Sequence, residues 1–245
     1  MCVFLSMRAD QSHLQKRFGS VEIDLNFFKP AYLQSAFEFP RWPVITGEQP
    51  KRFSFLTWGL IPPWVRSAEE ARKFRANTVN ARAETLFDKP AFRSAAANRH
   101  CLVVVDGFFE FRELDGRKFP YFIRMREGQP FTMAGLHDTW VDPATGEVIP
   151  TFTIVTTRAN GVMAKIHNRK KRMPVILPKE QEMEWLTAGS GGAELLAPCP
   201  DDWLQAWPVS GLITSRTAER NVPSVQEPYS YQELTNEKPL QGSLF

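Results

Sequence analysis

The sequence predicts an α+β fold, in which a twisted, barrel-like antiparallel β-sheet forms the core and helices are inserted into it and flank it. Short runs rich in Val, Ile, Phe and Thr recur along the chain, separated by turns that contain Gly or Pro. Charged segments with helix-capping residues lie between these runs. With 245 residues and 43% hydrophobic content, the chain is long enough to bury a substantial core.

Each predicted strand is an apolar or aromatic run that ends at Gly, Pro or charged residues. In chain order, the predicted strands are 42–46, 53–64, 101–111, 120–125, 130–140, 151–157 and 172–178. The second of them ends in a Pro-Pro turn, and 101–111 (CLVVVDGFFEF) is predicted as one continuous strand. Many short strands of this kind are typical of a sheet that twists and curls upon itself.

Helices are predicted at the start of the chain, in its first half and near residue 180. The helix at 10–18 can begin at Asp10 or Ser12 and stop at Gly19. The segment 67–86 begins as a charged helix and then loses its regularity. The third helix, at 179–189, is closed by its own C-terminal glycine.

The domain organisation follows from composition. Residues 1–224 are predicted to form one domain, because no repeat or low-complexity block divides them. The polar, Pro-containing segment 225–245 is predicted to be a C-terminal tail that lies on or off this domain.

Charge and cysteine usage limit the function classes. A net charge of +3 and a pI near 8.8 are compatible with nucleic-acid binding but do not diagnose it. The three cysteines form no CxxC pair, which argues against a disulfide framework and a zinc ribbon, so no metal or other cofactor is expected. No signal peptide or transmembrane stretch is evident, so a reduced, cytoplasmic protein, nucleoid-associated if it binds DNA, is expected.

Cys2 is the first candidate functional residue. Removal of Met1 exposes a thiol and a primary amine on adjacent carbons, a pair that no internal residue has. Chance placement of a small residue at the second position is the alternative.

Two polar residues stand inside core-like sequence. Alternation along a strand places Glu110 among phenylalanines, where desolvation raises the pKa of a carboxyl towards a useful acid/base range. The alternative is an edge strand with Glu110 facing water. His167 precedes a basic run and can act as a base or hydrogen-bond partner, or is simply a histidine on a surface loop. The other histidines (His13, His100 and His137) are expected to be structural.

A third group lies in the segment NTVNARAET. Asn80, Arg82 and Glu84 alternate with small residues, so an extended backbone points all three the same way. Asn80 can hydrogen-bond a sugar or an amine, and Arg82 can bind a phosphate. A capping and salt-bridge cluster is the alternative.

Taken together, these segments resemble the SOS response-associated peptidases, also called abasic-site processing proteins. In chain order, the matching segments are Met-Cys at the start, WGLIPPW at 58–64, NARAET at 80–85, DGFFEF at 106–111, FTIVTT at 152–157 and IHNRKKRMPVIL at 166–177. They span most of residues 1–180 and follow the order found in the family.

The resemblance implies a reaction with the aldehyde of an abasic site in single-stranded DNA. Cys2, as the mature N-terminus, forms an imine through its amine and then a thiazolidine through its thiol. Glu110 is the implied proton shuttle, and His167 assists at the sugar oxygen. Asn80 holds the Cys2 amine or the sugar.

The resemblance also implies a set of DNA contacts. Thr156 is the implied hydrogen-bond donor near the lesion, Arg82 and Arg172 match phosphate-binding positions, and Trp64 packs on a neighbouring base. Trp58 is expected in the core instead.

The sequence departs from the family pattern in three places. Val3 and Phe4 replace the usual Gly-Arg after the cysteine, so one phosphate-binding arginine is absent. The segment FPRWPVIT at 39–46 replaces an asparagine-containing one. Four residues, NRKK, are inserted after His167, and Arg169 among them is expected to restore the missing positive charge.

Two further functions compete with the crosslinking of abasic DNA. One is peptide hydrolysis, on the protein's own Met1 or on other peptides. The other is non-covalent binding of single-stranded DNA. Whichever function holds, the protein is expected to be a monomer. In addition, the C-terminal QGSLF resembles the peptide by which repair proteins dock on the sliding clamp, through Gln241, Leu244 and Phe245.

Overall fold

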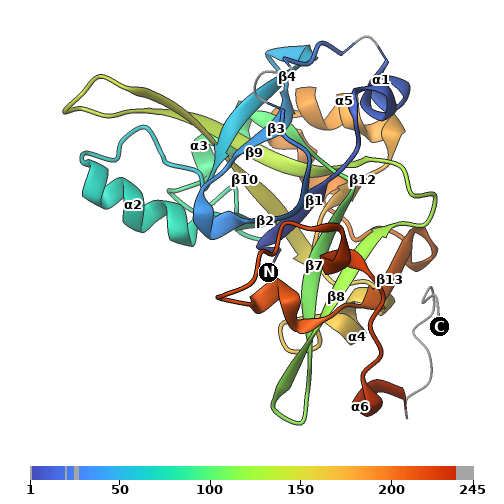
Figure 1. Cartoon of the computed structure of the whole chain (residues 1–245). Coiled ribbons are helices and arrows are strands. Elements are labelled where there is room, and N and C mark those ends of the chain that lie inside the picture. The colour runs from blue at the N-terminus through green and yellow to red at the C-terminus, as the bar shows by residue number, and fades with distance from the viewer. Residues whose placement is uncertain (1, 20, 25–27, 236–245) are drawn as a thin grey trace.

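The structure is a computed structural model that describes residues 2–19, 21–24 and 28–235. Its centre is a barrel, because β10 pairs with both β4 and β9 and so closes the order β10-β4-β3-β6-β9 (Figure 1). The barrel strands are β3 (Arg41–Thr46), β4 (Gln49–Trp58), β6 (His100–Val105), β9 (Phe131–Val141) and β10 (Val148–Arg158). The predicted α+β class with a barrel-like sheet is confirmed.

A second, five-stranded sheet lies beside the barrel. Its strands, in spatial order, are β13 (Leu204–Pro208), β8 (Arg117–Met125), β7 (Gly107–Leu114), β1 (Phe4–Met7) and β2 (Ala31–Ser35). All of its pairings are antiparallel. The sheet therefore places the N-terminal strand next to β7.

The prediction of one strand over 101–111 is wrong, because the chain leaves the barrel at Asp106 and enters the second sheet as β7. The buried Asp106 carboxylate accepts hydrogen bonds from the Ser6 hydroxyl at 2.6 Å and from the Arg8 backbone N–H at 2.5 Å. At Gly107, a Cβ atom would lie 2.3 Å from the Phe122 ring, so only glycine fits this crossing.

Other strands are also shorter than predicted. The strand predicted over 53–64 ends at Trp58, because Gly59 has φ +104° and passes close to the Arg75 backbone. The strand predicted over 172–178 is divided into β11 (Arg172–Pro174), on β10, and β12 (Ile176–Leu177), on β9. The barrel sheet, unlike the second sheet, is not wholly antiparallel, since β10 is parallel to both β4 and β5 (Asn80–Arg82).

The predicted helices are present with adjusted ends. α1 (Gln11–Phe18) is capped by Asp10, whose carboxylate accepts from the His13 N–H, and it stops at Gly19. α2 (Ala68–Asn77) is capped by Ser67. α5 (Lys179–Thr187) ends two residues before Gly189. The further helices are α3 (Arg93–Asn98), α4 (Gly161–Ile166) and α6 (Gln232–Thr235), and the 3-10 turns are Ala36–Glu38, Gly189–Leu195, Asp201–Trp203, Gly211–Thr214 and Pro223–Gln226.

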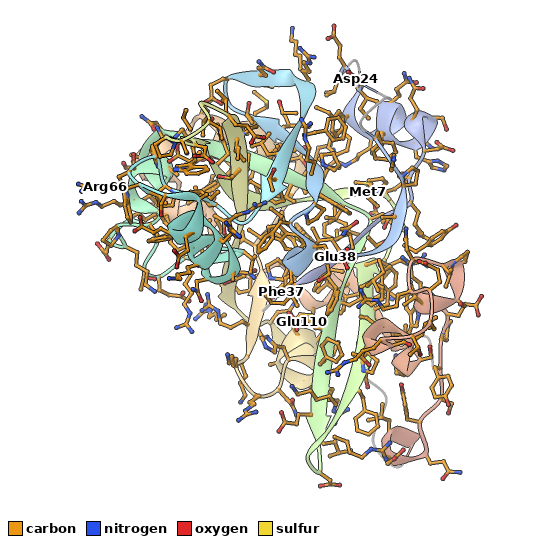
Figure 2. All side chains as sticks on the ribbon, turned by 60° about the vertical axis from the view of Figure 1, so that its left-hand side comes forward. Met7, Asp24, Phe37, Glu38, Arg66 and Glu110 are labelled. Carbon is orange, nitrogen blue, oxygen red and sulfur yellow. The ribbon has the colours of Figure 1, made fainter. Side chains whose placement is uncertain are left out.

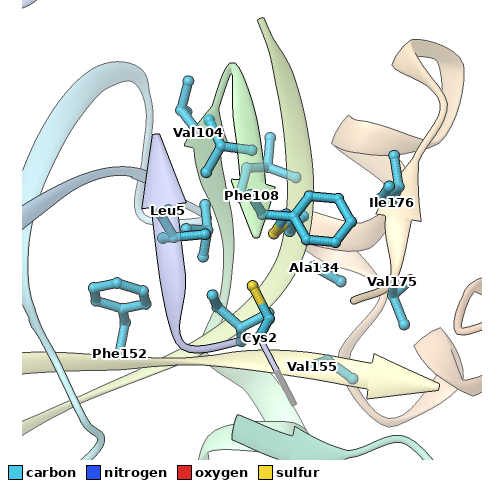
Figure 3. Packing of buried hydrophobic residues seen from close by; sticks show 14 of the residues in the cluster. Cys2, Leu5, Val104, Phe108, Ala134, Phe152, Val155, Val175 and Ile176 are labelled. Atoms are coloured by element: carbon cyan, nitrogen blue, oxygen red, sulfur yellow. The ribbon is translucent and has the colours of Figure 1, made fainter. Parts of the chain in front are cut away.

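One hydrophobic core joins the barrel to the second sheet. Cys2 belongs to it and lies in the same cluster as Leu5, Phe152 and Val155 (Figure 3). Burial of this apolar surface is the main stabilising contribution to the fold. The start of the predicted tail contacts the same body, since Gln226 is buried and its amide donates to the Ser6 hydroxyl at 2.7 Å.

The clamp-binding residues proposed from the sequence, Gln241, Leu244 and Phe245, lie outside the described residues. Among the helices that are described, none is long and apolar enough to cross a membrane.

Candidate functional site

The candidate site lies where the N-terminus, β5, β7, β10 and the loop after α4 meet. Cys2 lies two residues before the start of β1. β1 pairs with β7, the strand that carries Glu110. Asn80 on β5 pairs beside β10, which carries Thr156. His167 ends α4. The side-chain view shows Glu110 near the centre of the molecule, whereas Asp24 and Arg66 extend from its outline (Figure 2).

Cys2 is held in an apolar environment. Its residue is 1% exposed, and burial raises the pKa of its thiol well above the ordinary value. The negative charge of Glu110 raises it further, while the Phe4 backbone N–H, which donates to the sulfur, lowers it. The thiol is therefore protonated at neutral pH, and the pairing of Phe4 with Phe109 places Cys2 and Glu110 on neighbouring segments.

Glu110 is 3% exposed, so the alternative of an edge residue that faces water is wrong. β1 pairs with β7 only over 107–109, whereas β8 pairs with it over 108–114. Glu110 therefore stands just past the end of β1, where the other edge of β7 is open to side chains from elsewhere. A carboxyl buried in this way is suited to proton transfer.

Asn80 connects β5 to the N-terminal residue. Its amide nitrogen donates to the Cys2 carbonyl at 2.8 Å. Its amide oxygen is buried and has no hydrogen-bond partner among the described residues. Leaving a buried acceptor unsatisfied costs about 1–3 kcal/mol. This oxygen can therefore accept a hydrogen bond from a donor such as an amine or a sugar hydroxyl.

His167 is 8% exposed, so the alternative of a histidine on a surface loop is wrong. Its Nδ1 lies 2.9 Å from the Arg172 carbonyl oxygen and 3.3 Å from the Arg172 amide nitrogen. The shorter contact favours the tautomer in which Nδ1 donates, which leaves Nε2 as the basic nitrogen. The inserted residues form the turn that makes this contact, with the Lys171 N–H donating to the His167 carbonyl at 2.8 Å.

Arg172 connects His167 to Thr156. Its guanidinium donates to the Thr156 carbonyl at 2.5 Å and to the Thr156 hydroxyl at 3.2 Å. It also pairs with Glu84 at 2.6 Å. The Thr156 hydroxyl in turn donates to the Ala81 carbonyl at 3.1 Å. The hydrogen bonds described for Thr156 and Arg172 are thus internal to the protein.

The remaining predicted DNA contacts lie on the surface. Arg82 is exposed, and Trp64 is 48% exposed with its ring edge-on to Phe74. Arg169 is exposed and pairs with Glu113 at 3.4 Å. Trp58, by contrast, is fully buried, as expected of a core residue.

Sequence reasoning missed Asn168. Its side-chain oxygen accepts from the Glu113 N–H at 3.0 Å, and its nitrogen donates to the Glu113 carbonyl at 2.6 Å. The amide thereby replaces a strand partner on the open edge of β7 and ties the His167 loop to the strand of Glu110. The two residues are 55 positions apart, and no local pattern signals their contact.

Among the described residues, no group of three or more His, Cys, Asp or Glu side chains is arranged to hold a metal ion.

Comparison with known proteins places this geometry in a family. Residues 1–216 match the model of the SOS response associated peptidase (SRAP) family. The chain is 37% identical over 189 residues to the abasic site processing protein YoqW of Bacillus subtilis, covering 75% of this chain and 80% of that protein. It is 31% identical over 151 residues to the abasic site processing protein HMCES of Gallus gallus, covering 54% of this chain and 44% of that protein.

Solved structures agree with the sequence comparison. A protein from Bacteroides thetaiotaomicron superposes with a TM-score of 0.86 at 35% identity, over 94% of this chain and 100% of the other. A protein from Bordetella bronchiseptica does so with a TM-score of 0.73 at 29% identity, over 85% of this chain and 100% of the other. Since the family match covers residues 1–216 of 245, the chain belongs to the SRAP family.

Proposed function

We propose that this protein processes abasic sites in single-stranded DNA, and that Cys2, freed by removal of Met1, forms a covalent crosslink with the lesion. The observation on which the proposal depends is the placement of Cys2: its thiol is buried near Glu110 and its backbone is held by Asn80. The names of the relatives, abasic site processing proteins, support the substrate class.

The chemistry needs no cofactor. The opened deoxyribose presents an aldehyde at C1′, and the Cys2 amine, with a pKa of about 8 as a free terminus, is partly neutral at physiological pH. Its nitrogen attacks C1′, and loss of one water gives an imine. The sulfur then adds to the carbon of the protonated imine while the thiol proton passes to the Glu110 carboxylate, which closes a five-membered thiazolidine. Because this ring closure is intramolecular, proximity strongly favours it.

The buried residues have separate roles in this sequence. Glu110 takes a proton from the amine, gives it to the departing hydroxyl during imine formation, and accepts the thiol proton during ring closure. His167, with Nε2 as its basic nitrogen, assists opening of the sugar. The Asn80 amide oxygen accepts a hydrogen bond from the amine or the sugar. Thr156 accepts hydrogen bonds from Arg172 and so helps to position that side chain beside the site.

The raised pKa of the thiol favours the order amine first, thiol second. A protonated thiol does not compete as a nucleophile while the imine forms. Once the positively charged imine is present, it lowers the cost of ionising the thiol beside it.

The exposed residues contact the single-stranded DNA on either side of the lesion. Arg82 and Arg169 are placed to attract phosphates, and Trp64 offers a ring on which a base can stack for about 1–3 kcal/mol.

A denaturing gel tests the proposal. Purified protein is incubated with a single-stranded oligonucleotide that carries one abasic site, and then heated. We expect a shifted band without added borohydride, absent in Cys2→Ala, with the mass of the protein lacking Met1 plus the DNA minus one water.

Other outcomes favour the competing functions. Unchanged DNA binding in Cys2→Ala, with no heat-stable band in either protein, favours a non-covalent binding module. Hydrolysis of unrelated peptides that depends on Cys2 favours a peptidase.

A further inference from the structure

Glu84 carries a charge that the proposed reaction does not use. It lies in the turn after β5, where the Thr85 N–H donates to the Arg82 carbonyl at 3.0 Å. Its carboxylate contacts the Arg172 guanidinium at 2.6 Å, and its side chain remains 51% exposed. An acidic side chain at the entrance of a site that binds a polyanion opposes that binding, so its presence needs a reason.

The two ends of the ion pair are held very differently. Arg172 is only 12% exposed on its side chain, and two hydrogen bonds to Thr156 fix its other terminal nitrogen. Glu84, by contrast, is more exposed, and besides Arg172 its carboxylate is described with a hydrogen bond only from its own backbone N–H. The Arg172 guanidinium is therefore fixed in position, whereas the Glu84 carboxylate can be replaced by another anion.

The charge of a second arginine also acts on this carboxylate. The pKa of Glu84 lies below its ordinary value, chiefly because of the hydrogen bond from Arg172, and the charges of Arg172 and of the exposed Arg82 contribute. Glu84 is thus ionised at neutral pH and neutralises both arginines that the family resemblance assigns to phosphates. Its carboxylate is thus bound to Arg172 and stabilised further by the charge of Arg82.

We propose that Glu84 is an internal substitute for a DNA phosphate: its carboxylate occupies the anion position at the Arg172 guanidinium in the free protein and leaves it when a backbone phosphate arrives. The inference rests on the proposed function. Exchange of one anion for another gives little net electrostatic gain, so intact single strands are held weakly and released. A strand with an abasic site is retained by its covalent bond instead. Glu84 therefore sets specificity without touching the reacting atoms.

Glu84→Gln tests this inference, because it removes the charge while keeping the shape of an exposed side chain. Glu69→Gln is the matched control: Glu69 is also in an exposed ion pair, with Lys73 on α2 at 2.8 Å, and its loss changes the net charge equally. Fluorescence anisotropy measures the affinity for a lesion-free single-stranded oligonucleotide. The crosslinking rate is measured at saturating abasic DNA, and thermal unfolding checks the fold.

We expect Glu84→Gln to bind the lesion-free strand about 2- to 5-fold more tightly than the wild type, the effect of freeing a partly exposed ion pair. Glu69→Gln should match the wild type, and the crosslinking rate at saturation should be unchanged in both variants. Equal or weaker binding by Glu84→Gln, or an equal gain in Glu69→Gln, overturns the inference. If the wild type neither binds nor crosslinks single-stranded DNA, the proposed function fails as well, which separates the two failures.

Discussion

Two regions of this protein bury a cysteine near a glutamate, and only one of them is a candidate site. Cys2 lies near Glu110 where β1 begins, and Cys101 lies within β6 near Glu48. In both, burial is the main cause that raises the pKa of the thiol, and the glutamate is a further one. Burial and a perturbed pKa therefore do not distinguish the two regions.

The regions differ in how completely their polar groups are satisfied. Around Cys101, both ring nitrogens of His100 face backbone carbonyls, at 2.7 Å from Trp185 and 2.9 Å from Ala96, and the ring stacks on Trp185. A Cβ atom on Gly135 would lie 2.8 Å from the Cys101 sulfur, so no space is left. Around Cys2, the side-chain oxygen of Asn80, the first residue of β5, is buried and has no hydrogen-bond donor among the described residues. The Cys2 region is thus distinguished by an unsatisfied buried amide oxygen on the side chain that hydrogen-bonds the cysteine backbone.

The largest expected effect separates the two thiols. Cys2→Ala should abolish the heat-stable adduct with abasic DNA, because neither the ring sulfur nor its stabilising closure remains. Cys101→Ala should crosslink at close to the wild-type rate. The measurement is band intensity on a denaturing gel over time. Loss of the adduct in a folded Cys101→Ala protein would remove the distinction.

The two glutamates should differ next. Glu110→Gln should slow crosslinking by roughly 10²–10⁴-fold, the usual contribution of a positioned general acid/base. Glu48→Gln, which removes a carboxylate 3.1 Å from the His137 Nε2, should change the rate by less than about 2-fold, because Glu48 is exposed and lies outside the candidate site. Single-turnover kinetics at saturating DNA measure both, and similar rates for the two variants would contradict the role of Glu110.

Function and stability should respond oppositely in the two regions. Asn80→Ala loses a hydrogen bond to Cys2 but also removes an unsatisfied oxygen, so the free energy of unfolding should change by less than about 1 kcal/mol. Its crosslinking rate should fall about 10- to 100-fold through lost positioning.

Gly135→Ala should instead lower the free energy of unfolding by about 1–3 kcal/mol, because the added methyl overlaps the Cys101 sulfur and the Thr153 carbonyl. Urea unfolding and crosslinking kinetics of both variants make the comparison. Strong destabilisation in Asn80→Ala would mean that Asn80 is structural.

The smallest effect is on alkaline stability. Burial raises the pKa of Cys199 from 9.0 to about 12, and it raises that of Cys101 as well. The unfolded chain then loses thiol protons that the folded chain keeps, so the stabilising contribution is complete below pH 9 and falls as the pH rises above it.

Each such thiol steepens the fall by at most about 1.4 kcal/mol per pH unit. The urea midpoint of Cys101→Ala should therefore depend less on pH than that of the wild type. Parallel pH profiles would show that this thiol ionises normally in the folded protein.

Local patterns in the sequence were sufficient for α1, α2, α5 and most strands, whereas the short helices α3, α4 and α6 were not predicted. The cap at Asp10 and the stop at Gly19 place α1, and apolar alternation identifies the barrel strands. The crossing at Asp106 escaped prediction, because the Ser6 and Arg8 groups that satisfy its carboxylate come from about 100 residues earlier. The parallel pairing of β10 with β5 escaped for the same reason.

For the candidate site, the sequence determined which chemistry is available: a cysteine at position 2, a carboxyl between phenylalanines, and an asparagine and a histidine in distinct motifs. Residue type and strand alternation are local properties, so they can be read along the chain. Only the tertiary structure decided that Glu110 is buried, that Arg172 pairs with Glu84 and hydrogen-bonds Thr156, and that Asn168 joins the His167 loop to the strand of Glu110. These depend on contacts between segments far apart in sequence, which form only when the barrel and the second sheet close around the N-terminus.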